Sequence, residues 1–123
     1  MKVLLTISSS MMGGAQNHVF DLAVHLASRG IVPVVACPSG YLYEKLSSSE
    51  NVSVYRISVS PLCILQLCRM IFREKPDIVH LHLLGAGLYG ILACLVMRQK
   101  RRFYTVQNVV VYPGMPSWKR AIF

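Results

Sequence analysis

The sequence contains few acidic side chains: five Asp and Glu among 123 residues, against thirteen Lys and Arg. No two of the five are spaced as a general acid–base pair, and there is no G-x-S-x-G nucleophile motif and no cysteine in a nucleophile pattern. These absences exclude a self-sufficient hydrolase-type catalytic set. We expect a binding cleft rather than a complete catalytic centre. The acidic residues are Asp21, Glu44, Glu50, Glu74 and Asp77.

Cysteine is also sparse and is not arranged for metal binding or for a disulfide framework. The four cysteines include no Cys-x-x-Cys pair and no Cys/His group with zinc-finger spacing, so we expect reduced thiols packed as small apolar residues. The first apolar run, Val3 to Ile7, is too short for a secretory signal, which predicts a cytoplasmic protein. The cysteines are Cys37, Cys63, Cys68 and Cys94.

Apolar and basic residues are abundant. The hydrophobic fraction is 54%, the mean hydropathy is +0.47 and the formal net charge is +8, which excludes a disordered chain and favours anionic partners. Nucleic acid is disfavoured because the basic residues are not interleaved with aromatics. Basic clusters at 69–75 and 98–102 are solvated faces or contacts with an anionic membrane surface, and the pattern leaves both open.

Short apolar runs alternate with longer amphipathic ones. The pattern predicts an α/β fold: a Rossmann-like, doubly wound, mostly parallel sheet of about five strands with helices on both faces. The expected strands are Val3–Ser8, Val32–Cys37, Val52–Ile57, Ile78–His82 and Phe103–Val106. The expected helices are Ala15–Ser28, Leu42–Ser48, Leu62–Glu74 and Gly87–Arg98.

The run Val79–Met97 has no formal charge and nearly the length of a membrane span. Internal glycines and the preceding Pro76-Asp77 favour a buried strand, a loop and a helix instead. A transmembrane helix is the less favoured alternative.

The junction between the first strand and the first helix contains Gly13 and Gly14. Glycines there let main-chain amides approach a ligand, and a helix N-terminus at the carboxyl end of a parallel strand is a site for phosphate. The loop matches neither G-x-G-x-x-G nor a Walker loop. A tight turn that needs positive φ is the structural alternative.

Histidines form the other group of candidates. His80 and His82 are two apart on a strand and point to one side of the sheet. We expect His80 to be a hydrogen-bonded core residue and His82 to line the cleft, with no metal, because a third ligand is missing from the pattern. His18 and His25 lie seven apart on one face of the first helix, on an exposed flank.

Three segments together resemble the N-terminal domain of family 4 glycosyltransferases of the GT-B fold: residues 1–30 with the Gly13-Gly14 loop, PDIVHLH at 76–82, and RRFYTVQN at 101–108. The resemblance implies a retaining transferase that uses a nucleotide-sugar, without a metal or other cofactor. It also implies that Gly13 and Gly14 face the donor diphosphate, and that His82 and Gly85 form the acceptor side. Gln107 stands where the family commonly has a histidine contacting the donor sugar, and Asn108 follows it. We expect both to line the acceptor side of the cleft with His82 and Gly85.

The resemblance further implies that residues 1–123 are part of the acceptor-side domain and that the donor-binding domain, with its two glutamates, is absent. We therefore expect a truncated hexosyltransferase of polysaccharide biosynthesis, inactive alone, acting on a glycan or lipid-linked acceptor at the inner membrane face. Two alternatives remain: a membrane-associated subunit of a split enzyme that recruits a donor-domain chain, and a non-catalytic module that binds a phosphorylated ligand.

Overall fold

The computed structural model describes residues 1–105, except for the side chains of residues 84–86. Strands and helices alternate strictly within this part of the chain, and the strands form a five-stranded parallel sheet in the order β3-β2-β1-β4-β5. The strands are β1 (Lys2–Ile7), β2 (Val32–Cys37), β3 (Ser53–Arg56), β4 (Ile78–His82) and β5 (Arg102–Thr105). The helices are α1 (Gly14–Ser28), α2 (Tyr41–Ser47), α3 (Leu62–Glu74) and α4 (Leu84–Val96).

The predicted elements are confirmed with small shifts of their ends, except that Val106, the predicted end of the fifth strand, lies outside the described residues. The largest shift is at α4, which begins at Leu84 rather than Gly87, because the backbone turns into the helix directly after Leu83. The run Val79–Met97 is divided between β4 and α4, as the internal glycines indicated. Within residues 1–105, no helix combines the length and the apolar character needed to cross a bilayer.

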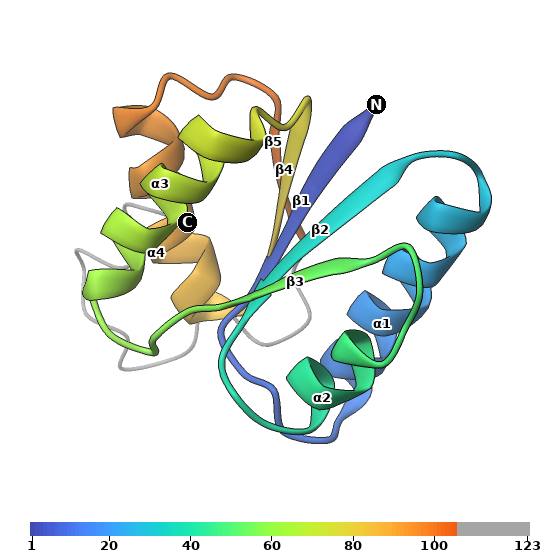
Figure 1. The fold of residues 1–123 in the computed structure, drawn as a ribbon. Helices are drawn as coiled ribbons and strands as arrows, with labels where there is room; N and C mark the ends of the chain where they lie inside the picture. Colours follow the sequence, from blue (N-terminus) through green and yellow to red (C-terminus); the bar gives the residue numbers. More distant parts are fainter. Residues whose placement is uncertain (106–123) are drawn as a thin grey trace.

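Helices cover both faces of the sheet: α1 and α2 lie on one side, α3 and α4 on the other (Figure 1). Alternate residues of β1 therefore enter different cores, with Leu4 packing toward α3 and α4 and Leu5 toward α1 and α2. Burial on both faces explains why the strand sequences are nearly continuous apolar runs. The cysteines are free thiols within these cores or at their edge, as predicted.

Helix α4 lies close to the sheet because small residues face it. A Cβ added at Gly90 would lie 2.4 Å from a methyl carbon of Leu81, and one at Gly87 would lie 2.4 Å from the ring of Tyr104. No real Cβ is found at such a distance, so both glycines are required by the close packing of α4 on β4 and β5.

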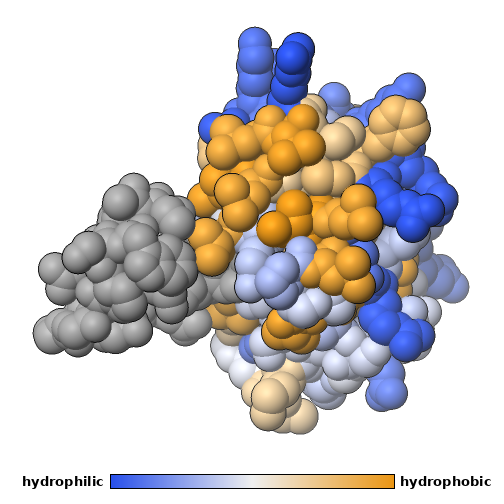
Figure 2. All heavy atoms as spheres, turned by 90° about the vertical axis from the view of Figure 1, so that its left-hand side faces the viewer, coloured by the Kyte–Doolittle hydropathy of each residue, from blue (hydrophilic) through white to orange (hydrophobic). Residues whose placement is uncertain are grey.

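Part of the large apolar content of the sequence is exposed, on the side of the molecule formed by α3 and α4. Figure 2 shows hydrophobic side chains gathered on this face with hydrophilic ones at its border. The exposed apolar residues of the two helices are Leu62, Leu65, Phe72, Leu92, Leu95 and Val96.

Candidate functional site

The order of the strands reverses between β1 and β4. The chain runs from β1 outward through β2 to β3, then returns to the other side of β1 and continues through β4 to β5. Open α/β sheets bind ligands at such a reversal, outside the carboxyl ends of the strands. Ile7 of β1 pairs with His82 of β4 in the parallel register, so both strands end at the same edge. The Gly13-Gly14 loop and the tip of the two-histidine strand therefore share one rim of the sheet.

The N-terminus of α1 is open toward this edge. Gly13 is the N-cap residue and Gly14 the first helical residue; no side chain caps the helix, and its first turn has no acidic residue. The first amides of the helix are left for other partners, and the positive end of its dipole is not neutralised locally. This arrangement suits the binding of a phosphate or diphosphate group.

The backbone conformation argues against the turn interpretation of the two glycines. Gly13 is extended, with φ 177° and ψ 177°, and Gly14 does not have a positive φ. A Cβ at Gly14 would meet no atom within 4 Å, and one at Gly13 would meet only the flexible end of Gln16, 2.8 Å away. Neither residue has a positive φ, so the backbone conformation does not require glycine at either position.

The loop that carries these glycines is anchored to its neighbour by Ser10, a residue that the sequence pattern did not single out. The buried Ser10 hydroxyl donates a hydrogen bond to the carbonyl of Pro38, and the Ser10 carbonyl accepts one from the Leu42 N–H at 3.0 Å. Gly40 has φ +142°, and a Cβ there would lie 3.1 Å from Cβ of Ser10. The β2–α2 connection thus holds the β1–α1 loop in place.

The histidines form a cluster from α1 and β4. The rings of His80 and His82 are 4.2 Å apart between centroids, and the ring of His18 meets His82 edge-on at 5.6 Å. His80 is hydrogen-bonded to the Thr105 hydroxyl, as expected of a core histidine. Burial, and secondarily the nearby His18, lowers the pKa of His80, which favours its neutral form.

His82 is fully buried, and the exposed imidazole beside it belongs to His18. The expected role of His82 in lining the cleft therefore stays a prediction. His18 and His25 are both exposed, as the sequence predicted. The contact between the rings of His18 and His82 depends on tertiary packing and was not predicted. Within residues 1–105, no three potential ligands are placed to hold a metal ion.

Leu83 marks the end of β4 with a strained backbone. Its φ is +67° and its ψ is 160°, a region that glycine normally occupies, and it is the N-cap residue of α4. Gly85 lies in the first turn of α4. Gln107 and Asn108 lie outside the described residues, so their expected contacts stay predictions.

Comparison with known proteins identifies the family. The sequence profile of Glycosyltransferase Family 4 matches residues 12–122, which is most of the chain. The chain belongs to glycosyltransferase family 4. No curated protein matches it.

Solved structures of GT-B glycosyltransferases share the fold of this family 4 chain. A glycosyltransferase from Rickettsia africae ESF-5 has a TM-score of 0.71 at 21% identity, over 92% of this chain and 31% of its own. Anabaena Alr3699/HepE in complex with UDP-glucose has a TM-score of 0.76 at 18% identity, over 99% of this chain and 34% of its own. Acinetobacter baumannii MurG has a TM-score of 0.69 at 20% identity, over 90% of this chain and 36% of its own. The chain thus spans about a third of the length of these structures.

Proposed function

We propose that this chain is the acceptor-side domain of a retaining, hexosyltransferase-type glycosyltransferase. It acts with a donor-binding domain to transfer a sugar from a nucleotide-sugar to a glycan or lipid-linked acceptor in polysaccharide biosynthesis. The observation that carries the proposal is the uncapped N-terminus of α1 at the strand-order reversal, on the same edge as the tip of β4. Similar structures were solved with UDP and with UDP-glucose, which supports a nucleotide-sugar as donor.

The proposed mechanism assigns the Gly13 and Gly14 amides to the donor diphosphate. When the anomeric carbon leaves the diphosphate oxygen for the acceptor hydroxyl, negative charge accumulates on the leaving group. Fixed N–H donors and the positive end of α1 stabilise that charge without reorganisation, an effect worth roughly 3–4 kcal/mol for one well-placed donor. In this proposal no metal is needed. The acceptor approaches from the β4–α4 side, where His82 and Gly85 lie, and Gln107 and Asn108 are assigned to the same side of the cleft.

The proposed location is cytoplasmic and peripheral at the inner face of the membrane. The net charge of +8 supports it, and so do the exposed apolar residues of α3 and α4. Lipid-linked acceptors are presented at such a surface.

The experiment that tests the function is a titration of the amide-labelled chain with UDP-glucose, GDP-mannose and pyrophosphate, followed by NMR. We expect weak binding that shifts the Gly13 and Gly14 amides, because the resemblance assigns most donor contacts to the other domain. Ligand binding that leaves both amides unshifted contradicts the proposal. Tight nucleotide binding by the chain alone supports the phosphate-ligand module instead.

A transfer assay with UDP- and GDP-sugars tests the need for a second domain. We expect no turnover from the isolated chain. Clear product formation by the chain alone shows that a donor-binding domain is not needed. Co-purification with a chain of donor-domain type favours the split enzyme.

A further inference from the structure

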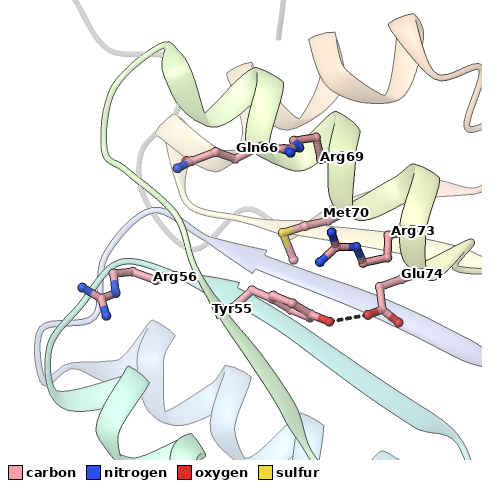
Figure 3. Close-up of a pocket in the computed structure, with 7 residues that line it drawn as sticks. All are labelled: Tyr55, Arg56, Gln66, Arg69, Met70, Arg73 and Glu74. Carbon is pink, nitrogen blue, oxygen red and sulfur yellow. Dashed lines mark hydrogen bonds between the residues drawn. The ribbon is translucent and has the colours of Figure 1, made fainter.

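A second concave site lies away from the Gly13-Gly14 loop, between the edge strand β3 and helix α3 (Figure 3). The pocket has a volume of about 240 Å³. No residue of the β1–α1 loop lines it. Its lining residues are Tyr55, Arg56, Gln66, Arg69, Met70, Arg73 and Glu74.

Two arginines give this pocket its charge. Arg69 and Arg73 are four residues apart on α3 and so lie on one face of the helix. Neither guanidinium forms an ion pair with another residue of the described part of the chain. Arg56 lies at the border, with its guanidinium 5.6 Å from the ring centroid of Tyr43 on the other side of the sheet, and we do not count it as a ligand. Arg69 and Arg73 therefore keep their N–H donors for an external anion.

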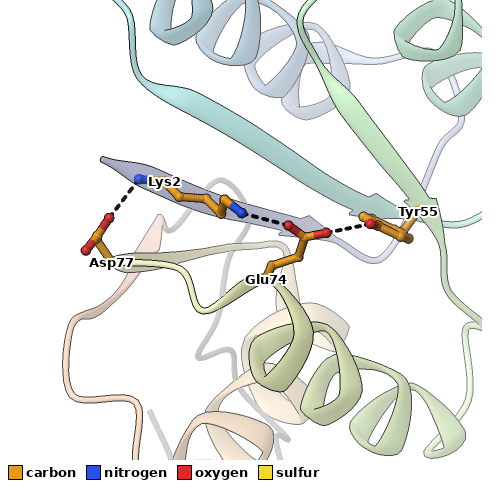
Figure 4. Close-up of polar contacts among 4 residues, drawn as sticks. All are labelled: Lys2, Tyr55, Glu74 and Asp77. Carbon is orange, nitrogen blue, oxygen red and sulfur yellow. Dashed lines mark hydrogen bonds and ion pairs between the residues drawn. The ribbon is translucent and has the colours of Figure 1, made fainter.

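The only acid among the lining residues is already paired. Glu74 accepts hydrogen bonds from Lys2 Nζ at 2.9 Å and from the Tyr55 hydroxyl at 2.5 Å (Figure 4). These two partners lower the pKa of Glu74, the hydrogen bond from Tyr55 contributing most. Arg73 also lies near enough to Glu74 to favour its charged form. With Lys2, Arg69 and Arg73 beside a single carboxylate, the pocket has a positive excess.

Gln66 supplies a further donor. Its Oε1 accepts a hydrogen bond from the Ser58 N–H at 2.8 Å and another from the Ser58 hydroxyl at 3.2 Å. With the amide oxygen so occupied, the amide nitrogen is left as a donor. Arg69, Arg73 and Gln66 thus offer planar N–H groups along one wall of the pocket, which suits a tetrahedral oxyanion.

We propose that the pocket between β3 and α3 binds a phosphate group, either of a phospholipid or of a soluble phosphorylated compound. This site is separate from the Gly13-Gly14 loop and goes beyond the proposed function. Exposed Leu62, Leu65 and Phe72 lie on the same helix as the arginines, with exposed fractions of 56%, 60% and 72%. A phospholipid can contact the arginines with its phosphate and these apolar side chains with its acyl chains, so the test includes lipid as well as soluble phosphate.

The test compares two double variants of the full chain that each remove two positive charges. R69Q/R73Q changes the pocket. K100Q/R101Q is the matched control, because both of its residues are exposed and neither lines the pocket. Each protein is titrated with pyrophosphate and with inorganic phosphate, and is sedimented with phosphatidylcholine vesicles with and without phosphatidylglycerol. Thermal unfolding checks that both variants are folded.

We expect R69Q/R73Q to weaken binding about tenfold or more, as the loss of charge-assisted hydrogen bonds does, and the control to weaken it about twofold or less. If R69Q/R73Q loses binding only to vesicles, the phosphate group belongs to a lipid. If it also loses binding to pyrophosphate or inorganic phosphate, the phosphate group belongs to a soluble compound. Equal weakening by both doubles shows diffuse charge attraction and overturns the proposal, as does the absence of any effect. G14P in the same titrations separates this site from the proposed donor site, because it removes an amide of the loop and leaves the pocket intact.

Discussion

Ile7 and His82 are paired residues at the last step of the register between β1 and β4. Because the strands are parallel, the segment after Ile7 and the segment after His82 emerge at the same edge of the sheet. The Gly13-Gly14 loop and the start of α4 thereby lie at one edge of the sheet, although about seventy residues of sequence separate them. The proposed function depends on this pairing, because it uses both segments.

The first prediction concerns the amide of Gly14. Proline is tolerated at the first helical position and requires an extended residue before it, which Gly13 provides. Gly14→Pro should therefore leave the stability nearly unchanged and remove one N–H donor. We expect kcat/KM of the enzyme completed by its donor-binding domain to fall about 100-fold or more.

Gly14→Ala is the control for this change, since it keeps the amide and its Cβ meets no atom within 4 Å. Steady-state transfer kinetics of both variants check the prediction. Equal activity of the proline and alanine variants would show that this amide does not act on the donor.

The second prediction concerns the contact between α4 and β4. Gly90→Ala places a methyl group against the side chain of Leu81, which is 1% exposed. We expect a loss of about 1–3 kcal/mol in the free energy of unfolding, the usual cost of overpacking. Urea denaturation measures it, with Gly14→Ala as the reference. A Gly90→Ala variant as stable as the parent would mean that α4 lies farther from the sheet.

The third prediction concerns Glu74, which joins Lys2 of β1 to Tyr55 of β3. Glu74→Gln should lower the stability at neutral pH by about 1 kcal/mol, because it loses charge-assisted hydrogen bonds. The folded-state pKa of Glu74 lies below its ordinary value of 4.5. The contribution of Glu74 to the free energy of unfolding is therefore complete above pH 4.5 and is lost as the pH falls through the lower folded-state pKa.

Urea denaturation of parent and Glu74→Gln at a series of pH values measures this effect. The difference between the two proteins should shrink in acid. A difference that stays constant below pH 4.5 would assign the effect to packing rather than to charge.

The fourth prediction concerns His80, whose pKa is lowered by burial and then by His18 of α1. The other groups around it are His82 on β4 and Thr105 on β5. Because the unfolded chain binds the proton more readily, stability is full above the ordinary value of 6.5 and falls as the pH drops below it toward the folded-state pKa.

His80→Gln should remove this part of the pH dependence, and unfolding midpoints on both sides of pH 6.5 check it. His25→Gln serves as the control, since His25 lies exposed near the far end of α1. Identical pH profiles for parent and His80→Gln would mean that another group titrates.

Much of the fold is explained by local patterns. Runs such as Val32–Cys37 predict strands covered on both faces, and the amphipathic repeat of Leu62–Glu74 predicts a helix with the ends that the structure has. The start of α4 was less predictable, since Leu83 enters the helix through a conformation that glycine normally adopts. No sequence rule anticipates a leucine there, because packing on both sides must hold it in place.

The candidate site was predictable only in part. The glycines at the junction of β1 and α1 pointed to a phosphate site, but their extended conformation and the anchoring of the loop by Ser10 required the structure. The full burial of His82 and its ring contact with His18 were likewise beyond the sequence, since both depend on tertiary packing.

The sequence by itself determined the alternation of strands and helices, the parallel sheet and the positive charge, since each depends on residue type and on spacing along the chain. The tertiary structure alone decided which distant side chains meet: Glu74 with Lys2 and Tyr55, His18 with His82, and α3 with β3 around the arginine pocket. Such contacts depend on strand order and on the packing of helices across the sheet, and neither is encoded in any local stretch of residues.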